Sequence, residues 1–562
     1  MKKRIISLLV VLTFVISSTA FSYAGAASNS VKLTLPTFNV TLNGMNMDNS
    51  YSKYPLIVYK DITYFPMTYS DCRYLGIEST WKGNQEGLFI DATDITAAYN
   101  PYNTKTKNSK NYNATIPTFP IKINGELIDN SKEKYPLLSF RDITYFPITW
   151  EFGVDKFGWD YSFDSKKGLV INSQNIHLAQ TRVPNDKVKD SEVVAIADGY
   201  VYYVGTKGRI MQAKISTANN EAVIGTTTSK VVYQLPINSY GDGKSYVLPS
   251  LYSEDGKAYL TYLTGATMGT DYLVLLNNVG ATIINDSRNV QKSLEGKEFK
   301  WWVGPAPGGD NLYMKTDELL NPPEAGYEGW KKIGSPDYLY GWIWKINDGI
   351  SESSASQGGS GSTDCYLIGD DLYILAFNMK KVEEYAKAGG TKPTTGIYQV
   401  NIKTNETKRI SEEEVSAFRV DGDYIYYHNS YVEFFKYKIS EKKEYPIGER
   451  RERGNNYISA FEVLNGKIYF QSGIDHGLYN INYEVLGLGL QELKLTGSND
   501  EYIACTLSGN ASKPDRIMVF DKNGKKVFRS SDAASAITVE GNAVYYYNVS
   551  TGTVCRGDIS TE

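Results

Sequence analysis

Hydrophobic and polar positions divide the chain into three stretches. The first, Ile5–Ile16, is an almost unbroken apolar run. The second, residues 30–172, holds short apolar and β-branched runs separated by polar turns. The third, from residue 192 onward, repeats a turn and an alternating strand about every 40–60 residues. Alternation with a period of two is the pattern of a half-buried strand, so most of the chain is predicted to be β structure.

The apolar run has the surroundings of a secretory signal. Basic residues at Lys2–Arg4 precede it, and small residues at Ala24–Ala26 follow it. The run is too short to span a bilayer as a helix. We therefore expect residues 1–27 to be a signal peptide that is removed on export. The mature chain would begin between Gly25 and Ser28 and keep no integral membrane segment.

One stretch of the second region occurs twice. It reads YPLIVYKDITYFPMTY at Tyr54–Tyr69 and YPLLSFRDITYFPITW at Tyr135–Trp150. Outside it, the same offset relates Pro36 to Pro117 and Asn43-Gly44 to Asn124-Gly125. Chance does not hold one register over so long a span, so the region is a duplicated unit.

The duplicated unit is predicted to be a small α+β module. Asn-Gly favours a tight hairpin turn, and a proline suits the first turn of a helix. The elements expected in the first copy are the strand Val40–Leu42, the turn Asn43-Gly44, strands Leu56–Tyr59 and Ile62–Phe65 about Lys60-Asp61, a helix from Pro66 to Gly76, and the strand Leu88–Ile90. The second copy repeats them with Pro147, Gly158 and Leu169–Ile171.

This order of motifs resembles the copper amine oxidase N-terminal-like domain, a stalk module of secreted bacterial proteins. The residues that carry the resemblance are Asn43-Gly44, Thr63-Tyr64-x-Pro66, Gly76 and Trp81 in the first copy, and Asn124-Gly125, Thr144-Tyr145-x-Pro147 and Gly158 in the second. Asp61-Ile62 and Asp142-Ile143 replace the family's usual Gly-Arg, and Thr68 and Thr149 stand where its helix often has Arg. The resemblance implies stalk modules at residues 28–91 and 116–172. Residues 92–115, which are rich in Asn, Thr, Lys and Tyr and have no apolar period, are predicted to be a linker, and residues 173–191 a second one.

The resemblance does not extend to amine oxidase chemistry. That reaction needs three imidazoles, two of them in a His-x-His pair, whereas the chain has only His177, His428 and His476, all far apart. Asn482-Tyr483-Glu484 matches the short context of the quinone-forming tyrosine, but three common residues are a weak signal. We expect no copper chemistry, no other metal site and no cofactor.

The third stretch is predicted to be a β-propeller of seven or eight blades at residues 192–562. Its repeat is a turn with Gly or Asp, followed by a strand with an apolar residue before Tyr. The copies are Asp198–Tyr202, Asp255–Tyr259, Gly309–Tyr313, Gly369–Tyr373, Asp421–Tyr426, Asn465–Tyr469 and Glu540–Tyr545, with a degenerate copy at Asn499–Cys505. It resembles the propeller-like domains of secreted clostridial and bacillus-type proteins. A pair of β-sandwiches is the alternative fold.

Composition narrows the range of partners. Removal of Lys2, Lys3 and Arg4 takes the formal net charge from −4 to about −7, which argues against nucleic acid. The cysteines Cys72, Cys365, Cys505 and Cys555 lack metal-type spacing. A disulfide between Cys505 and Cys555 and four buried free thiols both remain open.

The candidate ligand-binding residues lie in a tryptophan-rich stretch, Phe299–Ile346. Exposed aromatic rings stack on sugar faces, and nearby carboxylates accept hydrogen bonds from hydroxyls. The candidates are Trp330, Tyr327, Glu324, Glu328, Trp301 and Trp302. The alternative is that the tryptophans fill space between blades. A second irregular stretch, Lys380–Lys387, is predicted to be a helix that Gly389-Gly390 ends.

No catalytic motif appears in the sequence. The expected function is that of an exported, non-catalytic binding or scaffolding protein of the cell envelope, whose stalk presents the propeller to cell-wall glycan or a surface protein. A propeller enzyme, a glycoside hydrolase or lyase acting on extracellular polysaccharide, is the alternative. The enzyme would need acidic side chains that converge at the central channel.

Overall fold

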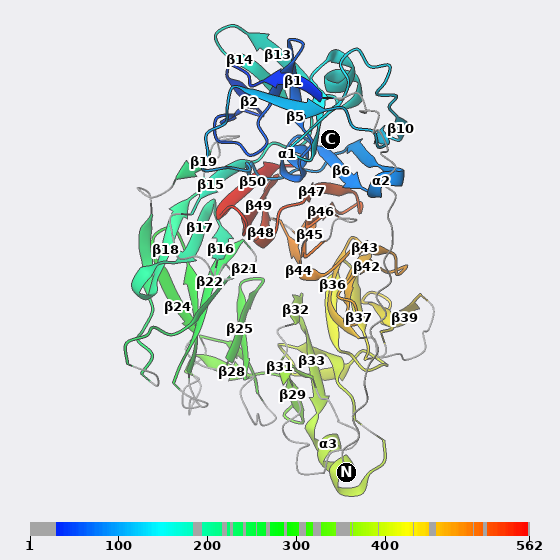
Figure 1. Ribbon diagram of the computed structural model, residues 1–562. Helices are drawn as coiled ribbons and strands as arrows, with labels where there is room; N and C mark the ends of the chain where they lie inside the picture. The colour runs from blue at the N-terminus through cyan, green and yellow to red at the C-terminus, as the bar shows by residue number, and fades with distance from the viewer. Residues whose placement is uncertain are drawn as a thin grey trace, which may run out of the picture.

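The computed structural model describes residues 30–559 except 184–193, 216–221, 225–228, 240–242, 255, 266–269, 286–288, 303–310, 318–327, 344–359, 362–363, 392, 431, 449–456, 498–499 and 510–513. The described part is mainly β, with an N-terminal domain at residues 30–172 and a larger set of sheets after it (Figure 1). The expected signal peptide, residues 1–27, lies outside the described residues.

The two copies of the duplicated unit meet in one closed barrel. Its strands, in order around the barrel, are β1 (Ser30–Thr34), β4 (Ile57–Tyr59), β5 (Ile62–Pro66), β12 (Ile143–Pro147), β11 (Leu138–Phe140) and β8 (Asn111–Thr115). Three helical segments complete the domain: α1 (Tyr69–Tyr74), α2 (Gly83–Glu86) and the π-helical η1 (Trp150–Lys156). Because β5 pairs with its own counterpart β12, the copies share a single barrel.

The two flanking sheets also mix strands from both copies. One has the order β10 (Glu126–Leu127), β9 (Ile121–Ile123), β7 (Leu88–Ala92), β6 (Ile77–Trp81), and the other β13 (Asp160–Asp164), β14 (Gly168–Asn172), β2 (Val40–Leu42), β3 (Met45–Asn46). Residues 28–91 and 116–172 were expected to be separate modules, and the structure corrects this. Residues 92–115 are likewise more than a linker, because β8 pairs with β1 from Ser30 to Thr34.

The predicted turns are confirmed, and the start of the helices is corrected. Asn43 and Gly44 have φ of 44° and 84°, the left-handed pair that a two-residue hairpin requires. Pro66 and Pro147 end strands β5 and β12 instead of opening helices. Helix α1 begins after Thr68, whose Oγ1 accepts a hydrogen bond from the Asp71 N–H. A threonine cap therefore sets the helix start.

Eight sheets of four or five strands follow within the described residues, numbered here in chain order. Sheet 1 is β16 (Val194–Ala197), β17 (Tyr200–Val204), β18 (Arg209–Lys214), β20 (Lys230–Gln234), with η2 (Thr206–Gly208). Sheet 2 is β21 (Pro249–Glu254), β22 (Lys257–Thr264), β23 (Thr270–Leu276), β24 (Ala281–Asn285). Sheet 3 is β25 (Asn289–Leu294), β26 (Lys297–Trp302), β27 (Leu312–Lys315), β28 (Trp330–Lys332). Sheet 4 is β32 (Cys365–Ile368), β33 (Asp371–Asn378), β34 (Gly396–Asn401), β35 (Thr407–Arg409), with β29 (Tyr338–Tyr340) beside β33.

The remaining sheets complete the set. Sheet 5 is β36 (Ala417–Asp421), β37 (Tyr424–His428), β38 (Phe434–Lys438), β39 (Lys443–Ile447). Sheet 6 is β40 (Ile458–Leu464), β41 (Lys467–Ser472), β42 (Leu478–Asn480), β43 (Val485–Gly487). Sheet 7 is β44 (Leu490–Thr496), β45 (Tyr502–Leu507), β46 (Ile517–Asp521), β47 (Lys526–Ser530). Sheet 8 is β48 (Ala534–Glu540), β49 (Ala543–Asn548), β50 (Thr553–Asp558), β15 (Ala179–Arg182), β19 (Ala222–Ile224). A small pair, β30 (Trp342–Ile343) and β31 (Ser360–Gly361), and helix α3 (Met379–Ala388) accompany sheet 4.

The eight sheets surround a common centre, and the chain closes the set on itself (Figure 1). Strand β15 pairs antiparallel with the last strand, β50, from Ala179↔Arg556 to Arg182↔Thr553. Residues 173–191 were expected to be a linker and the propeller to begin at residue 192. The structure corrects both, since β15 belongs to the last sheet. Three of its four residues, Gln180, Thr181 and Arg182, are polar, so the sequence gave no strand signal.

The predicted turn joins the first two strands of most sheets, with one correction. In sheet 3 that hairpin is Glu295-Gly296, with φ of 47° and 75°. Gly309–Tyr313 had been assigned to this position, but Leu312 and Tyr313 lie on the third strand, β27. The predicted helix is confirmed as α3, which ends at Gly389. All four cysteines are free and buried, so Cys505 and Cys555 form no disulfide.

Candidate functional site

The interface between sheets 2 and 3 differs from the other seven between neighbouring sheets. Each of those seven holds a cluster of buried apolar side chains drawn from both sheets. Among the described residues no such cluster joins sheets 2 and 3. Tyr252 and Leu263, on the side of sheet 2 that faces sheet 3, are 36% and 44% exposed, whereas Leu260 on the opposite side is fully buried. This interface is therefore open.

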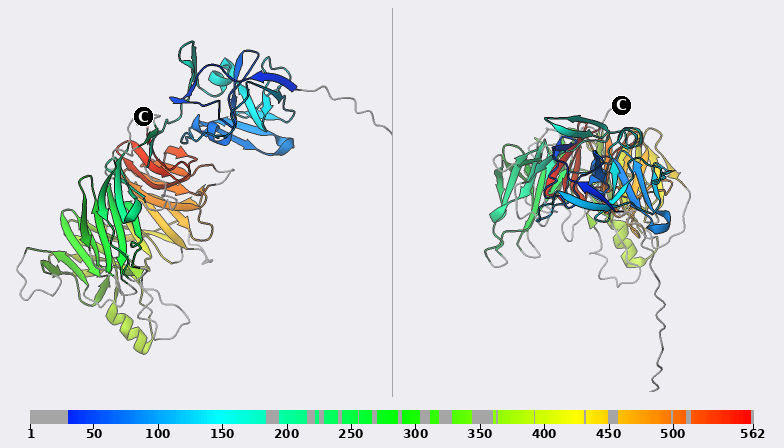
Figure 2. Two further views of the ribbon diagram at one scale, coloured as in Figure 1. Left: turned by 60° about the vertical axis from the view of Figure 1, so that its left-hand side comes forward. Right: turned by 45° about the horizontal axis from the view of Figure 1, so that its top comes forward.

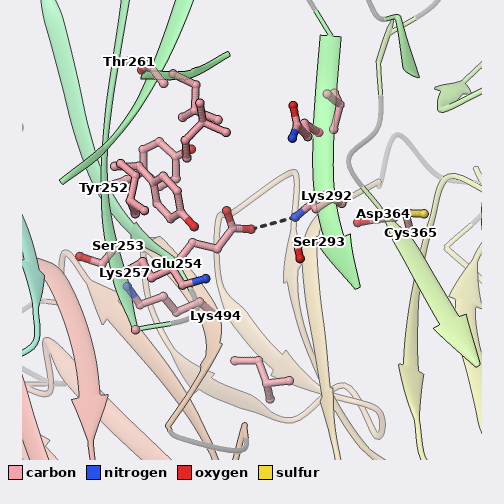
Figure 3. A pocket seen from close by; sticks show the side chains of 18 of the residues that line it. Tyr252, Ser253, Glu254, Lys257, Thr261, Lys292, Ser293, Asp364, Cys365 and Lys494 are labelled. Carbon is pink, nitrogen blue, oxygen red and sulfur yellow. Dashed lines mark hydrogen bonds and ion pairs between the residues drawn. The ribbon is translucent and has the colours of Figure 1, made fainter. Parts of the chain in front are cut away.

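The opening continues into a cavity of about 1590 Å³ at the centre of the sheets. Sheet 2 contributes the largest share of its wall, and β25 lies across from it. The inner strands β32, β36, β40, β44 and β48 each supply one or more residues. The first strand of a sheet lies nearest the centre, so residues from seven sheets line one cavity. Figure 3 draws part of this lining.

A pair of stacked tyrosines forms part of the sheet 2 wall. The rings of Tyr252 and Tyr259 have centroids 5.3 Å apart and an interplanar angle of 20°. They lie opposite each other on β21 and β22, in the same register that pairs Glu254 with Lys257. Burial raises the pKa of Tyr252, so its hydroxyl stays protonated at neutral pH. The pair offers a flat apolar platform with hydrogen-bonding edges.

The described residues that line the cavity include seven carboxylates and four cationic side chains. At least five of these carboxylates are ion-paired. Glu254 lies 3.3 Å from Lys292 of sheet 3, and Glu492 lies 3.0 Å from Lys494. Glu298 pairs with Lys315 at 3.0 Å, and the other two carboxylates pair with one arginine. The paired carboxylates remain hydrogen-bond acceptors, but each is held by a cation.

That arginine, Arg419, lies on β36 and joins three neighbouring sheets. Its Nη1 donates to Asp364 Oδ1 at 2.9 Å, and its Nε and Nη2 donate to the two oxygens of Glu462 at 2.9 and 3.2 Å. Burial lowers the pKa of Arg419, but the two carboxylates outweigh burial and hold that pKa above its ordinary value. The arginine therefore stays charged at the ring centre.

The structure separates the predicted ligand-binding residues. Trp301 is fully buried in the cluster between sheets 3 and 4, so its assignment to a binding surface was wrong. The alternating pattern of a strand predicts which residues share a side of the sheet, but it does not predict which side a neighbouring sheet covers. The Trp302 carbonyl accepts hydrogen bonds from Asn311 and from the Trp342 ring. Neither Trp301 nor Trp302 lines the cavity.

Trp330 lies in a strand of sheet 3. It opens strand β28, pairs with Lys315, and has the Lys300 ammonium 4.3 Å from its ring centroid. Strand register puts Trp330 on the side of sheet 3 that faces sheet 2, outside the lining of the cavity. Glu328 is exposed, and Tyr327 and Glu324 lie outside the described residues.

Sequence reasoning missed Tyr252 and Tyr259, although a signal was present. Both flank the Asp255-Gly256 turn at equal distances, so a two-residue hairpin places them opposite each other. The described residues contain no group of His, Cys, Asp and Glu placed to hold a metal ion. In the same residues no helix has the length and apolar character needed to cross a membrane.

No family model matches the chain, and no curated protein matches it. Among solved structures it is similar to the computationally designed Ika8 protein, with 11% identity over 66% of this chain and 96% of that chain and a TM-score of 0.33. It is also similar to BamB from Moraxella catarrhalis, with 11% identity over 68% of this chain and 100% of that chain and a TM-score of 0.30. It is similar as well to an oligogalacturonate lyase in complex with manganese, with 11% identity over 65% of this chain and 99% of that chain and a TM-score of 0.31. The described part of the chain is mainly β structure in many small sheets, and propeller-like proteins are among its structural neighbours.

Proposed function

We propose that this protein is an exported, non-catalytic binding protein whose eight-sheet propeller recognises a glycan chain and whose N-terminal domain holds the propeller at the cell envelope. The observation that carries the proposal is the stacked Tyr252–Tyr259 pair in an open cavity. Aromatic faces stack on the C–H faces of sugar rings, and phenol edges hydrogen-bond to hydroxyls. The cavity, of about 1590 Å³, reaches from sheet 2 to residues of the inner strands of the other sheets.

The charge arrangement supports binding over catalysis. Glycoside hydrolysis needs a protonated carboxyl and a carboxylate on either side of the scissile bond. Glu254, Glu298 and Glu492 are each ion-paired with a lysine. They fit the role of acceptors for sugar hydroxyls.

Binding of the mature protein to a glycan and cell-wall array tests the proposal. Tyr252→Ala should weaken binding by about 1–3 kcal/mol, because it removes half of the platform. Tyr457→Ala is the matched control, since this tyrosine is 54% exposed and lies outside the cavity. Its binding should equal that of wild type. Equal binding by both variants, or no glycan bound by wild type, would rule out the proposed site.

A second candidate function is a polysaccharide-cleaving enzyme, favoured by the convergence of Asp364 and Glu462 on Arg419 at the ring centre. Burial raises the pKa of Glu462, the direction that a general acid needs. Incubation with the bound glycan separates the two functions. An enzyme should release new chain ends, and Glu462→Gln should stop the release while binding persists. Intact glycan after prolonged incubation would exclude the enzyme.

A further inference from the structure

We infer that the sheet 2 wall of the cavity selects a sugar that bears an acetamido group, so that the bound glycan contains N-acetylated amino sugars. This inference rests on the proposed function, whose ligand it narrows to one chemical class. It is carried by the rows of side chains that continue from the stacked tyrosines along the same side of sheet 2.

The side of sheet 2 that faces sheet 3 leaves apolar side chains uncovered beyond the tyrosine pair. On β23, Leu273 and Leu275 are partly exposed, whereas Val274 and Leu276, which point to the opposite side, are buried. Strand β22 alternates in the same way, and there Leu263 is 44% exposed. The three leucines of the open side all line the cavity. They therefore favour a ligand that covers them with an apolar group.

Strand register arranges this side of sheet 2 in rows that run across the strands. The first row is Tyr252, Tyr259 and Leu275, and the second is Ser250, Thr261 and Leu273. Residues opposite each other on neighbouring strands have Cβ atoms about 5 Å apart. A leucine therefore lies beside the aromatic ring of the first row, and another lies beside the hydroxyl of the second.

The two hydroxyls of the second row are available to a ligand. Ser250 and Thr261 both line the cavity, and neither side chain forms a hydrogen bond with a described residue. Figure 3 shows Thr261 and Tyr252 on one wall of the cavity, with Lys292 and Ser293 on the other wall. A hydroxyl both donates and accepts, so it can bond to the N–H or to the C=O of an amide.

This combination of side chains fits an acetamido group better than a sugar hydroxyl. When a sugar ring stacks on Tyr259, a substituent at the edge of the ring lies over Leu275 and Leu273. A hydroxyl at that position would lose water without gaining a hydrogen bond from the leucines, which is unfavourable. An acetamido group instead places its methyl on the leucines and its amide within reach of the Thr261 hydroxyl.

Two oligomers that differ only in this substituent test the inference. A pentamer of N-acetylglucosamine is compared with the glucose pentamer of the same linkage, which has a hydroxyl in place of each acetamido group. Titration calorimetry with the wild-type protein should show roughly 10-fold tighter binding of the acetamido pentamer.

Two substitutions on the wall locate the source of this preference. Leu275→Asn keeps the approximate shape of the side chain but removes its apolar surface, and should reduce the preference to less than about 3-fold. Thr261→Val removes only a hydroxyl, and should weaken binding of the acetamido pentamer by roughly 3–10-fold. Leu127→Asn, at a leucine that is 65% exposed on the N-terminal domain, is the control for the first. Thr264→Val is the control for the second, since Thr264 lies on the opposite side of β22 and outside the cavity.

The outcomes separate this inference from the proposed function. A preference for the acetamido pentamer that falls in Leu275→Asn and Thr261→Val, and persists in both controls, supports the inference. Equal binding of the two pentamers by wild type, or a preference that both wall variants retain, overturns it. Binding of array glycans without binding of either pentamer overturns it as well, and in each of these cases the proposed function stands. If no glycan binds at all, the proposed function fails too.

Discussion

Asp71 is a buried carboxylate that hydrogen-bonds to Thr68, and among the described residues it forms no ion pair. It is 7% exposed, and its Oδ2 accepts a hydrogen bond from the Thr68 hydroxyl at 2.6 Å. Burial raises its pKa from 3.8 to about 6, while the Thr68 hydrogen bond acts in the opposite direction. The folded state therefore binds this proton more tightly than the unfolded state. Its stabilising effect is full below pH 4 and is lost as the pH rises toward 6.

Replacement of Asp71 by asparagine should therefore stabilise the protein at pH 8 and not at pH 4. Asparagine keeps the size of the side chain and an oxygen that accepts from Thr68, but it carries no charge. A pKa change of about two units corresponds to roughly 2–3 kcal/mol. Thermal unfolding at both pH values measures the effect. Asp142→Asn, at an exposed turn, is the control. A higher Tm for Asp71→Asn at pH 4 would contradict the assignment.

At the scale of elements, hairpins could be predicted because their chemistry is local. Asn43-Gly44 and the Lys60-Asp61 corner have the positive φ angles that two-residue turns require. Strands with little apolar content escaped prediction, and β8 and β15 are the examples. Their partners, β1 and β50, come from elsewhere in the chain, so the backbone pairing that defines them is absent from the local sequence.

The same limit applies to the candidate site. A strand pattern predicts that Trp301 and Trp302 point to opposite sides, but not which side a neighbouring sheet covers. The open interface between sheets 2 and 3 depends on how eight sheets are placed around the centre. The pairing of Tyr252 with Tyr259 could have been predicted from the Asp255-Gly256 sequence, because such a dipeptide favours a two-residue hairpin turn and the turn length sets the register.

The exchange of strands in the N-terminal domain predicts that neither copy folds alone. Strand β2 has three residues, and its core partners come from β14 of the other copy, with Leu42 opposite Ile171. The barrel likewise closes only when β5 meets β12. A fragment of residues 30–175 should unfold cooperatively in denaturant, whereas residues 30–115 should show no folded baseline. Cooperative unfolding of residues 30–115 would show that the copies are independent modules after all.

For the whole molecule, the junction between the N-terminal domain and the sheets is built from specific contacts. Arg529 of sheet 7 pairs with Glu78 at 2.6 Å and with Asp94 at 2.9 Å, both in the N-terminal domain. Next to it Thr96 and Ser530 form a β-bridge, and the Ala98 N–H donates to Asp532. Figures 1 and 2 show the domain against sheets 7 and 8. These contacts tie the N-terminal domain to sheets 7 and 8.

The Arg529 contacts should couple the two domains energetically. Its guanidinium is largely buried, and the Asp515 carboxylate of its own sheet holds it in place between the domains. A double-mutant cycle of Arg529→Met and Glu78→Gln should give a coupling free energy of about 1–3 kcal/mol, because a partly buried charge pair is lost.

The cycle of Lys132→Met and Asp129→Asn is the control, since this pair is exposed within the N-terminal domain. Its coupling free energy should be below about 1 kcal/mol. Arg529→Met should also separate the unfolding transitions of the two parts and widen the particle in small-angle scattering, because the domain then pivots about the chain connections. If the coupling at Arg529 equals that of the exposed pair and the scattering profile is unchanged, the β-bridge and backbone contacts hold the junction without the arginine.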